Sequence, residues 1–237
     1  QGGDVRLAGG KSAQGPSGSV IVEGGFASTF TGGDVSLQSG TGAATSSGHV
    51  TVATANAGVN GASGSVSMYT GTSSSGTTGS ISIYTGDATE GRAGDISLSV
   101  GVSTYDDGGD VDIVAGASTL AATTGGQVSI TAGAGTSTDL GNGGNGGSVL
   151  ISGGEGFGYN FRDTGGNVEL HAGNAEAGQG GAIILATGRS RDRSSGPLLM
   201  STTNAGKAGV SGDVGISTGA STAGSTGAIS LETGPAA

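Results

Sequence analysis

Residues 63–71 read Ser-Gly-Ser-Val-Ser-Met-Tyr-Thr-Gly, and residues 80–86 read Ser-Ile-Ser-Ile-Tyr-Thr-Gly. In both stretches an aliphatic residue alternates with serine, which is the period-two pattern of an extended segment with one apolar and one polar face. A glycine ends each stretch, and glycine is favoured where a tight turn needs a positive φ. Each stretch is therefore predicted to be a short strand followed at once by a turn.

The same pattern recurs along the whole chain in fifteen repeat units. Each unit begins with a glycine, which we number position 1. Nine of the fourteen spacings between successive starting glycines are 15 residues long. Positions 3 and 5 carry Val, Ile, Leu or Met in every unit, and they hold 30 of the 41 such residues in the chain. The starting glycines are Gly3, Gly18, Gly33, Gly48, Gly64, Gly79, Gly94, Gly109, Gly126, Gly147, Gly166, Gly181, Gly196, Gly212 and Gly227. This register indicates a repeating fold that places the aliphatic residues.

Composition alone gives a different picture. Glycine accounts for 55 of the 237 residues, the formal net charge is −10, and Leu, Ile, Val and Phe together number 43. Such values are typical of disordered chains. The register resolves the conflict, because a thin solenoid needs only two core side chains per coil. We therefore predict an all-β fold, a parallel β-solenoid (β-helix) of about fifteen coils with a thin two-layer core, whose coils stack at ~4.8 Å.

The chain also contains a longer repeat, which is made of several of the short units. Residues 48–86 align without gaps to residues 196–234 at an offset of 148, with 19 identities in 39 positions. Nine units therefore form a super-repeat. We expect residues 1–237 to be a single solenoid that belongs to a longer tandem array.

Several classes of function are excluded by what the sequence lacks. It has no Cys, and therefore no disulfide or thiolate chemistry. No apolar run approaches the ~18 residues that a membrane span needs. Only 8 Lys and Arg residues are present against 18 Asp and Glu, and nucleic-acid binding requires clustered cations. We expect neither a membrane span nor a nucleic-acid partner.

Catalysis is not expected either. The only two histidines, His49 and His171, fall in units 4 and 11, so ~35 Å of stacked coils would separate them. A serine nucleophile needs its base within hydrogen-bond reach. Hydrolysis of a glycan by paired carboxylates, among Asp95, Asp110 and Asp112, stays open as an alternative.

The same acidic residues are a candidate metal site. Asp95 and Asp110 share position 2 of successive units, Asp112 lies on the same face, and Asp106 and Asp107 lie in the turn between. Like charges this close repel unless a cation bridges them, and calcium takes several carboxylate and carbonyl oxygens. The alternatives are a structural calcium ion and plain solvated carboxylates, and no other cofactor is indicated.

One turn concentrates aromatic residues. Phe157, Tyr159 and Phe161 lie within residues 155–164 and are three of the eight aromatic residues in the chain. A protruding aromatic turn suits a partner contact, either lateral or with a polysaccharide. The alternative is that the three rings fold back over the edge of the core.

The stretches at 63–71 and 80–86 resemble the Gly/Ser/Thr-rich tandem repeats of large secreted or cell-surface proteins in microalgae such as diatoms. The resemblance covers the whole chain and implies an extracellular structural or adhesive role, but it transfers no functional residue. In coil length the chain also resembles ice-binding β-solenoids. Those proteins present flat uncharged arrays, whereas position 2 here includes Asp4, Asp34 and His49.

These observations lead to three hypotheses. The first is a structural protein of an extracellular filament or matrix, whose rods associate with themselves end to end and also side by side. The second is an ice- or surface-binding module, and the third is a glycan-binding or glycan-cleaving β-helix.

Overall fold

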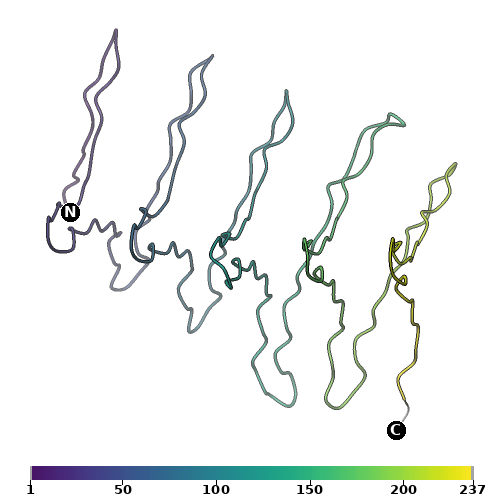
Figure 1. Ribbon diagram of the computed structural model, residues 1–237. Coiled ribbons are helices and arrows are strands. Elements are labelled where there is room, and N and C mark those ends of the chain that lie inside the picture. The colour runs from purple at the N-terminus through teal and green to yellow at the C-terminus, as the bar shows by residue number, and fades with distance from the viewer. Residues whose placement is uncertain (1, 236–237) are drawn as a thin grey trace. The chain divides into compact units, whose positions relative to one another are not determined.

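The computed structural model describes residues 2–235, and within them it contains no helix and no β-strand (Figure 1). The prediction of an all-β parallel β-solenoid is therefore wrong. Alternating aliphatic and polar residues indicate an extended segment with one apolar face, but a strand also needs a neighbouring segment with which to exchange a ladder of backbone hydrogen bonds. Residues 2–235 contain twelve backbone–backbone hydrogen bonds, whereas a globular chain of this length makes roughly 160.

By its internal contacts the chain divides into two larger parts, Gln1–Val111 and Asp112–Ala237, each of which contains several repeat units. Neither has a hydrophobic core, because no side chain in the described residues is buried. The accessible surface is 23761 Å² for a mass of 22.0 kDa. A folded monomer of this mass exposes about 9300 Å², and its unfolded chain about 32000 Å². The chain therefore covers only about a quarter of its unfolded surface, against around 70 % in a compact domain.

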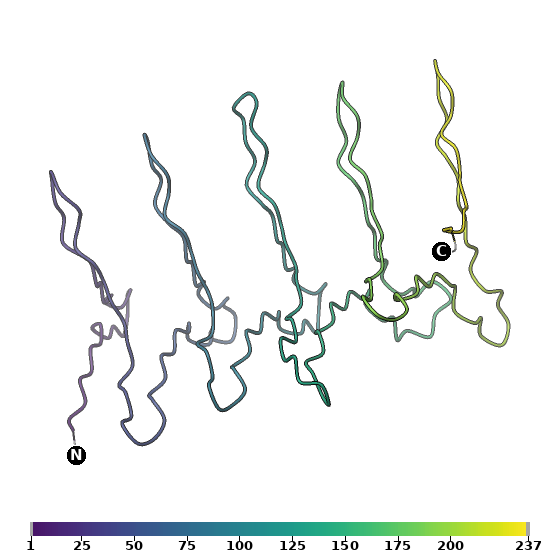
Figure 2. The ribbon, with the colours of Figure 1, turned by 90° about the horizontal axis from the view of Figure 1, so that it is seen from below.

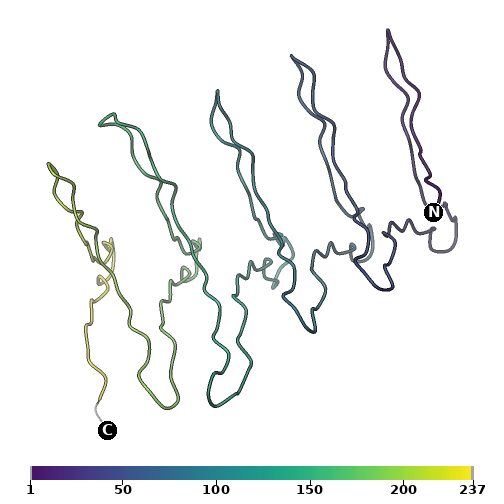
Figure 3. The same ribbon diagram turned by 180° about the vertical axis from the view of Figure 1, so that it is seen from behind.

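What recurs instead of a ladder is a closed turn. The backbone N–H of a starting glycine donates a hydrogen bond to the carbonyl oxygen of the glycine at position 8 of the preceding unit, at 2.8–3.1 Å. Seen from below and from behind, the chain repeatedly runs outward and returns beside itself (Figures 2 and 3). The closed turns are 10–18, 25–33, 40–48, 116–126, 133–147, 154–166, 173–181 and 188–196. One hydrogen bond per turn fixes the base of the turn without starting a ladder.

Close approach of the backbone accounts for the starting glycine in at least two of the closed turns. A Cβ atom on Gly18 would lie 2.9 Å from the backbone nitrogen of Gly10, and one on Gly33 would lie 2.9 Å from that of Gly25. The expectation that glycine ends each segment because φ is positive is wrong, since no glycine in residues 2–235 has a positive φ. The non-glycine residue with positive φ is Ala122, at 60°.

The two copies of the super-repeat have the same local structure. In the first copy Gly61 N–H donates to Gly58 O at 3.3 Å, and at the equivalent place in the second copy Gly209 N–H donates to Gly206 O at 3.3 Å. The sequence identity between the copies therefore extends to the conformation of their turns.

Candidate functional site: the exposed aliphatic columns

The aliphatic residues at positions 3 and 5 form two sets that we call the first and second columns. The first column is Val5, Val20, Val35, Val50, Val66, Ile81, Ile96, Val111, Val128, Val149, Val168, Ile183, Leu198, Val214 and Ile229. The second column is Leu7, Val22, Leu37, Val52, Met68, Ile83, Leu98, Ile113, Ile130, Ile151, Leu170, Leu185, Met200, Ile216 and Leu231. All thirty side chains are exposed.

The first column has nearly the same environment in every unit. Apart from Val5, its side chains are 49–62 % exposed, whereas those of the second column are 61–78 % exposed apart from Leu231. Aliphatic residues at position 4 of the same segments are more exposed, as at Leu150 (87 %) and Ile184 (84 %). The register is therefore expressed as a repeating level of exposure of the aliphatic side chains instead of a core.

The five aspartates proposed for calcium do not form a cluster. Asp95 accepts a hydrogen bond from Arg92 in an ion pair of 2.7 Å, and Asp106 Oδ1 accepts one from the backbone N–H of Asp107 at 2.9 Å. Asp110 and Asp112 make no side-chain hydrogen bond within residues 2–235. No group of three or more His, Cys, Asp or Glu side chains in this part of the chain is arranged to hold a metal ion. Calcium binding stays a sequence-based prediction.

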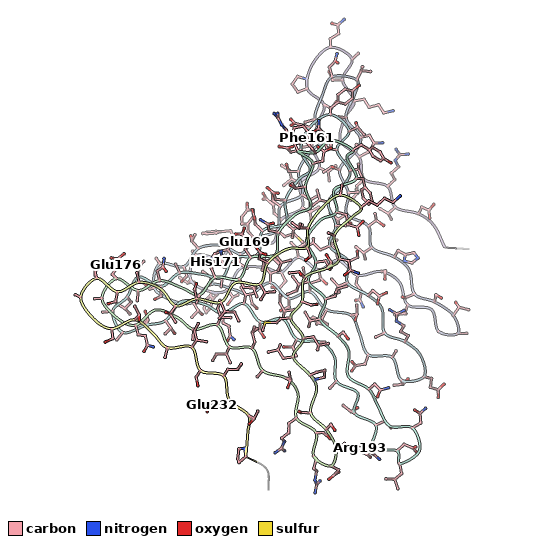
Figure 4. The ribbon with its side chains drawn as sticks, turned by 90° about the vertical axis from the view of Figure 1, so that its right-hand side faces the viewer. Phe161, Glu169, His171, Glu176, Arg193 and Glu232 are labelled. Atoms are coloured by element: carbon pink, nitrogen blue, oxygen red, sulfur yellow. The ribbon has the colours of Figure 1, made fainter. Side chains whose placement is uncertain are left out.

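The aromatic turn projects its rings into solvent. Phe157, Tyr159 and Phe161 are each more than four-fifths exposed, so they do not cover a core. The turn is closed by Gly166 N–H donating to Gly154 O at 2.9 Å. Phe161 is labelled in Figure 4, and the Arg162 guanidinium lies 5.4 Å from the centroid of its ring. The turn has the exposure that a partner contact needs, and the contact itself stays a prediction.

Of the two histidines, His171 has a charged neighbour in the described chain. His171 Nε2 lies 3.4 Å from Glu169 Oε2, and the two side chains are side by side in Figure 4. Both are well exposed, and no pocket indents the surface of residues 2–235. Within the same residues no helix is long and apolar enough to cross a membrane.

Serine at position 10 is a structural residue that the sequence analysis did not single out. In five units its Oγ accepts a hydrogen bond from the backbone N–H at position 13, at 2.9–3.2 Å. The serines are Ser12, Ser73, Ser103, Ser190 and Ser221. Serine favours such local bonds to the backbone, so its recurrence at a fixed repeat position was a usable signal.

Asp139 organises the longest turn. Its Oδ1 accepts hydrogen bonds from the backbone N–H groups of Asn142 at 2.8 Å and Gly141 at 2.9 Å. These two donors, that of Asn142 first, lower the pKa of Asp139 below its ordinary value of 3.8, because they stabilise the carboxylate.

We expect the two hydrogen bonds that Asp139 accepts to weaken in acid, because a protonated carboxyl group is a poorer acceptor than a carboxylate. A lowered pKa means that the additional stability of these bonds is fully present above pH 3.8 and is lost as the pH falls through the lower pKa of the folded turn. The amide proton shifts of Gly141 and Asn142 should therefore titrate together, with a midpoint below 3.8. In Asp139→Asn the amide oxygen still accepts, so the turn should persist and the titration should vanish. A midpoint at or above 3.8 would contradict this account.

No protein-family model matches the chain, and no curated protein and no solved structure is similar to it.

Proposed function

We propose that the chain is a structural protein of an extracellular filament or matrix, which assembles by association with further copies of itself. The observation that carries the proposal is the pair of aliphatic columns, thirty side chains that repeat at nearly constant spacing and are all exposed in the single chain. Large contiguous apolar surfaces on soluble proteins mark sites of interaction. The extracellular setting rests on the resemblance to algal tandem-repeat proteins.

The free energies support association through the columns. Burying the exposed half of one such side chain stabilises a complex by about 1 kcal/mol, so thirty of them offer at most about 30 kcal/mol. The loss of translational and rotational freedom costs roughly 4–15 kcal/mol. If only about half of the columns are covered, the gain of about 15 kcal/mol equals the upper end of that cost, so net association over the whole range requires that more than half be covered.

Periodicity favours a second copy as the partner. Apolar side chains that recur at a nearly fixed interval along a chain are best covered by a partner with the same interval. Another copy of this chain has the same interval because it has the same sequence. The backbone also favours pairing with another copy. Most of its N–H and C=O groups lack a backbone hydrogen-bond partner within the described chain and remain free to pair with a neighbouring chain. Stacking of solenoid ends, the route expected from the sequence, does not apply because residues 2–235 contain no strands to form a solenoid.

The proposal is tested by sedimentation velocity over a dilution series, followed by electron microscopy of the concentrated sample. We expect species heavier than the 22.0 kDa chain that grow with concentration, and elongated assemblies in the micrographs. A 22.0 kDa monomer at every concentration, with empty micrographs, would overturn it.

A further inference from the structure

Not every turn between units is closed. Fourteen turns connect the fifteen units, and eight have the hydrogen bond between position 8 and the next starting glycine. In the described residues the other six lack it: 55–64, 71–79, 86–94, 101–109, 203–212 and 219–227. Length does not separate the groups, since 10–18 is closed and 71–79, which is equally long, is open.

The residue at position 7 separates them. In seven units it is small, and all seven of the following turns are closed; these residues are Gly9, Gly24, Ser39, Ala115, Ala132, Gly153 and Ala172. In seven others it is β-branched, and six of the following turns are open; these residues are Thr54, Thr70, Thr85, Val100, Thr187, Thr202 and Thr218. The exception is Thr187, whose turn has the longest of the eight hydrogen bonds, at 3.1 Å.

A γ-methyl group explains the difference. In open turns it faces the starting glycine of the next unit: a Cβ atom built on Gly79 would lie 3.5 Å from Thr70 Cγ2, and one on Gly109 would lie 3.0 Å from Val100 Cγ1. At Thr187 no methyl carbon lies within 4 Å of the corresponding point on Gly196, and this turn is closed. The six open turns therefore share a γ-methyl group beside the next starting glycine, and the closed turn after Thr187 lacks it.

The hydroxyl group of threonine is not the cause. Ser39 has a hydroxyl and no γ-methyl, and its turn is closed by Gly48 N–H donating to Gly40 O at 2.9 Å. Val100 has γ-methyl groups and no hydroxyl, and turn 101–109 is open. The chain thus contains both controls.

We propose that position 7 is a conformational selector: a small residue allows the turn after it to close, and a γ-methyl group that faces the next starting glycine keeps the turn open. The selector is independent of self-association, because all its contacts lie within one turn.

The selector also determines where the chain tolerates longer turns. The three longest units start at Gly109, Gly126 and Gly147, and their turns all follow Ala or Gly and are all closed. A hydrogen-bonded base lets the turn project without disturbing the register of the next unit. Two of the open turns recur with the super-repeat, since the counterparts of Thr54 and Thr70 in its second copy are Thr202 and Thr218.

The test is amide hydrogen exchange of the starting glycines, measured by nuclear magnetic resonance on the full chain labelled with ¹⁵N-glycine. Ala172→Thr should open turn 173–181 and speed exchange of the Gly181 amide by roughly fivefold, the protection that one such hydrogen bond gives. Ala172→Ser, which adds a hydroxyl without a methyl, should leave the exchange rate unchanged. In the reverse direction, Thr70→Ala should slow exchange of Gly79, and Thr70→Val should not.

Each pair of variants can contradict the proposed role of position 7 separately. Unchanged protection of Gly181 in Ala172→Thr would overturn it, as would equal exchange of Gly79 in Thr70→Ala and Thr70→Val. If Ala172→Ser opens the turn as Ala172→Thr does, side-chain polarity and not the methyl group decides, and the proposal is wrong.

Discussion

Replacing Val128, Val149, Val168 and Ile183 together with serine is expected to abolish self-association at concentrations where the unchanged chain assembles. All four belong to the first column of Asp112–Ala237 and are about half exposed. Each loses about 1 kcal/mol of apolar burial at an interface, or about 4 kcal/mol in total. Since every 1.4 kcal/mol is a factor of ten in affinity, association should weaken by about a thousandfold. Sedimentation velocity over the same dilution series measures the shift.

The chain offers a matched control. Ile21, Leu150, Ile184 and Leu199 are also aliphatic and exposed, but they lie at position 4, outside both columns. Replacing these four with serine removes a similar apolar area, yet we expect association to change by less than about tenfold. The comparison separates column-specific contact from general loss of hydrophobicity.

Two results would contradict the role of the columns. One is assembly of the first-column variant at the concentration used by the unchanged chain. The other is equal weakening by the position 4 variant, which would mean that apolar surface of any placement drives association.

The repeat register could be predicted from the sequence because the same residue types recur at the same repeat positions. Positions 3 and 5 are aliphatic in all fifteen units, and their side chains have repeating exposures in the structure. Pairing was not predictable in this way. Ser80-Ile81-Ser82-Ile83 has the alternation of a strand, but alternation reports which side chains share a face and not which segment, of this copy or another, supplies the backbone partner.

The candidate site residues also differ in how far their arrangement could be predicted from the sequence. The exposure of Phe157, Tyr159 and Phe161 follows from their place in a long turn, and the sequence indicated that turn. The expected gathering of Asp95 with Asp110 depended on stacked coils, and the described residues contain no strands to form them and no metal-binding group of three or more acidic side chains. The exposure of the aromatic turn thus depended on one repeat unit, whereas the aspartate cluster depended on two successive units.

The glycines show why residue type alone can mislead about cause. Glycine at a turn suggested a positive φ, yet at Gly18 and Gly33 the residue is needed because another backbone segment would lie 2.9 Å from an added Cβ. Both causes select glycine, so the sequence cannot distinguish them. Position 7 does distinguish closed from open turns in the sequence, since all seven small residues there precede closed turns and six of the seven β-branched residues precede open ones.

The dilute chain is expected to show no cooperative thermal unfolding. A compact protein absorbs about 0.7 kcal/mol per residue on unfolding near 60 °C, or about 160 kcal/mol for 237 residues. That heat comes largely from breaking packed contacts and hydrogen bonds, and the described chain has no buried side chain and twelve backbone–backbone hydrogen bonds. Differential scanning calorimetry below the association range should therefore give a flat trace, and far-ultraviolet circular dichroism should show neither helix nor strand bands.

The same measurements on the associated chain provide the comparison. If copies cover each other's columns, concentration should produce a heat-absorbing transition whose midpoint rises with protein concentration, because association stabilises only the bound form. A sharp transition in the dilute monomer, independent of concentration and accompanied by a strand spectrum, would show that one chain completes its own core. The columns would then be covered from within, and neither their exposure nor the proposal of self-association could stand.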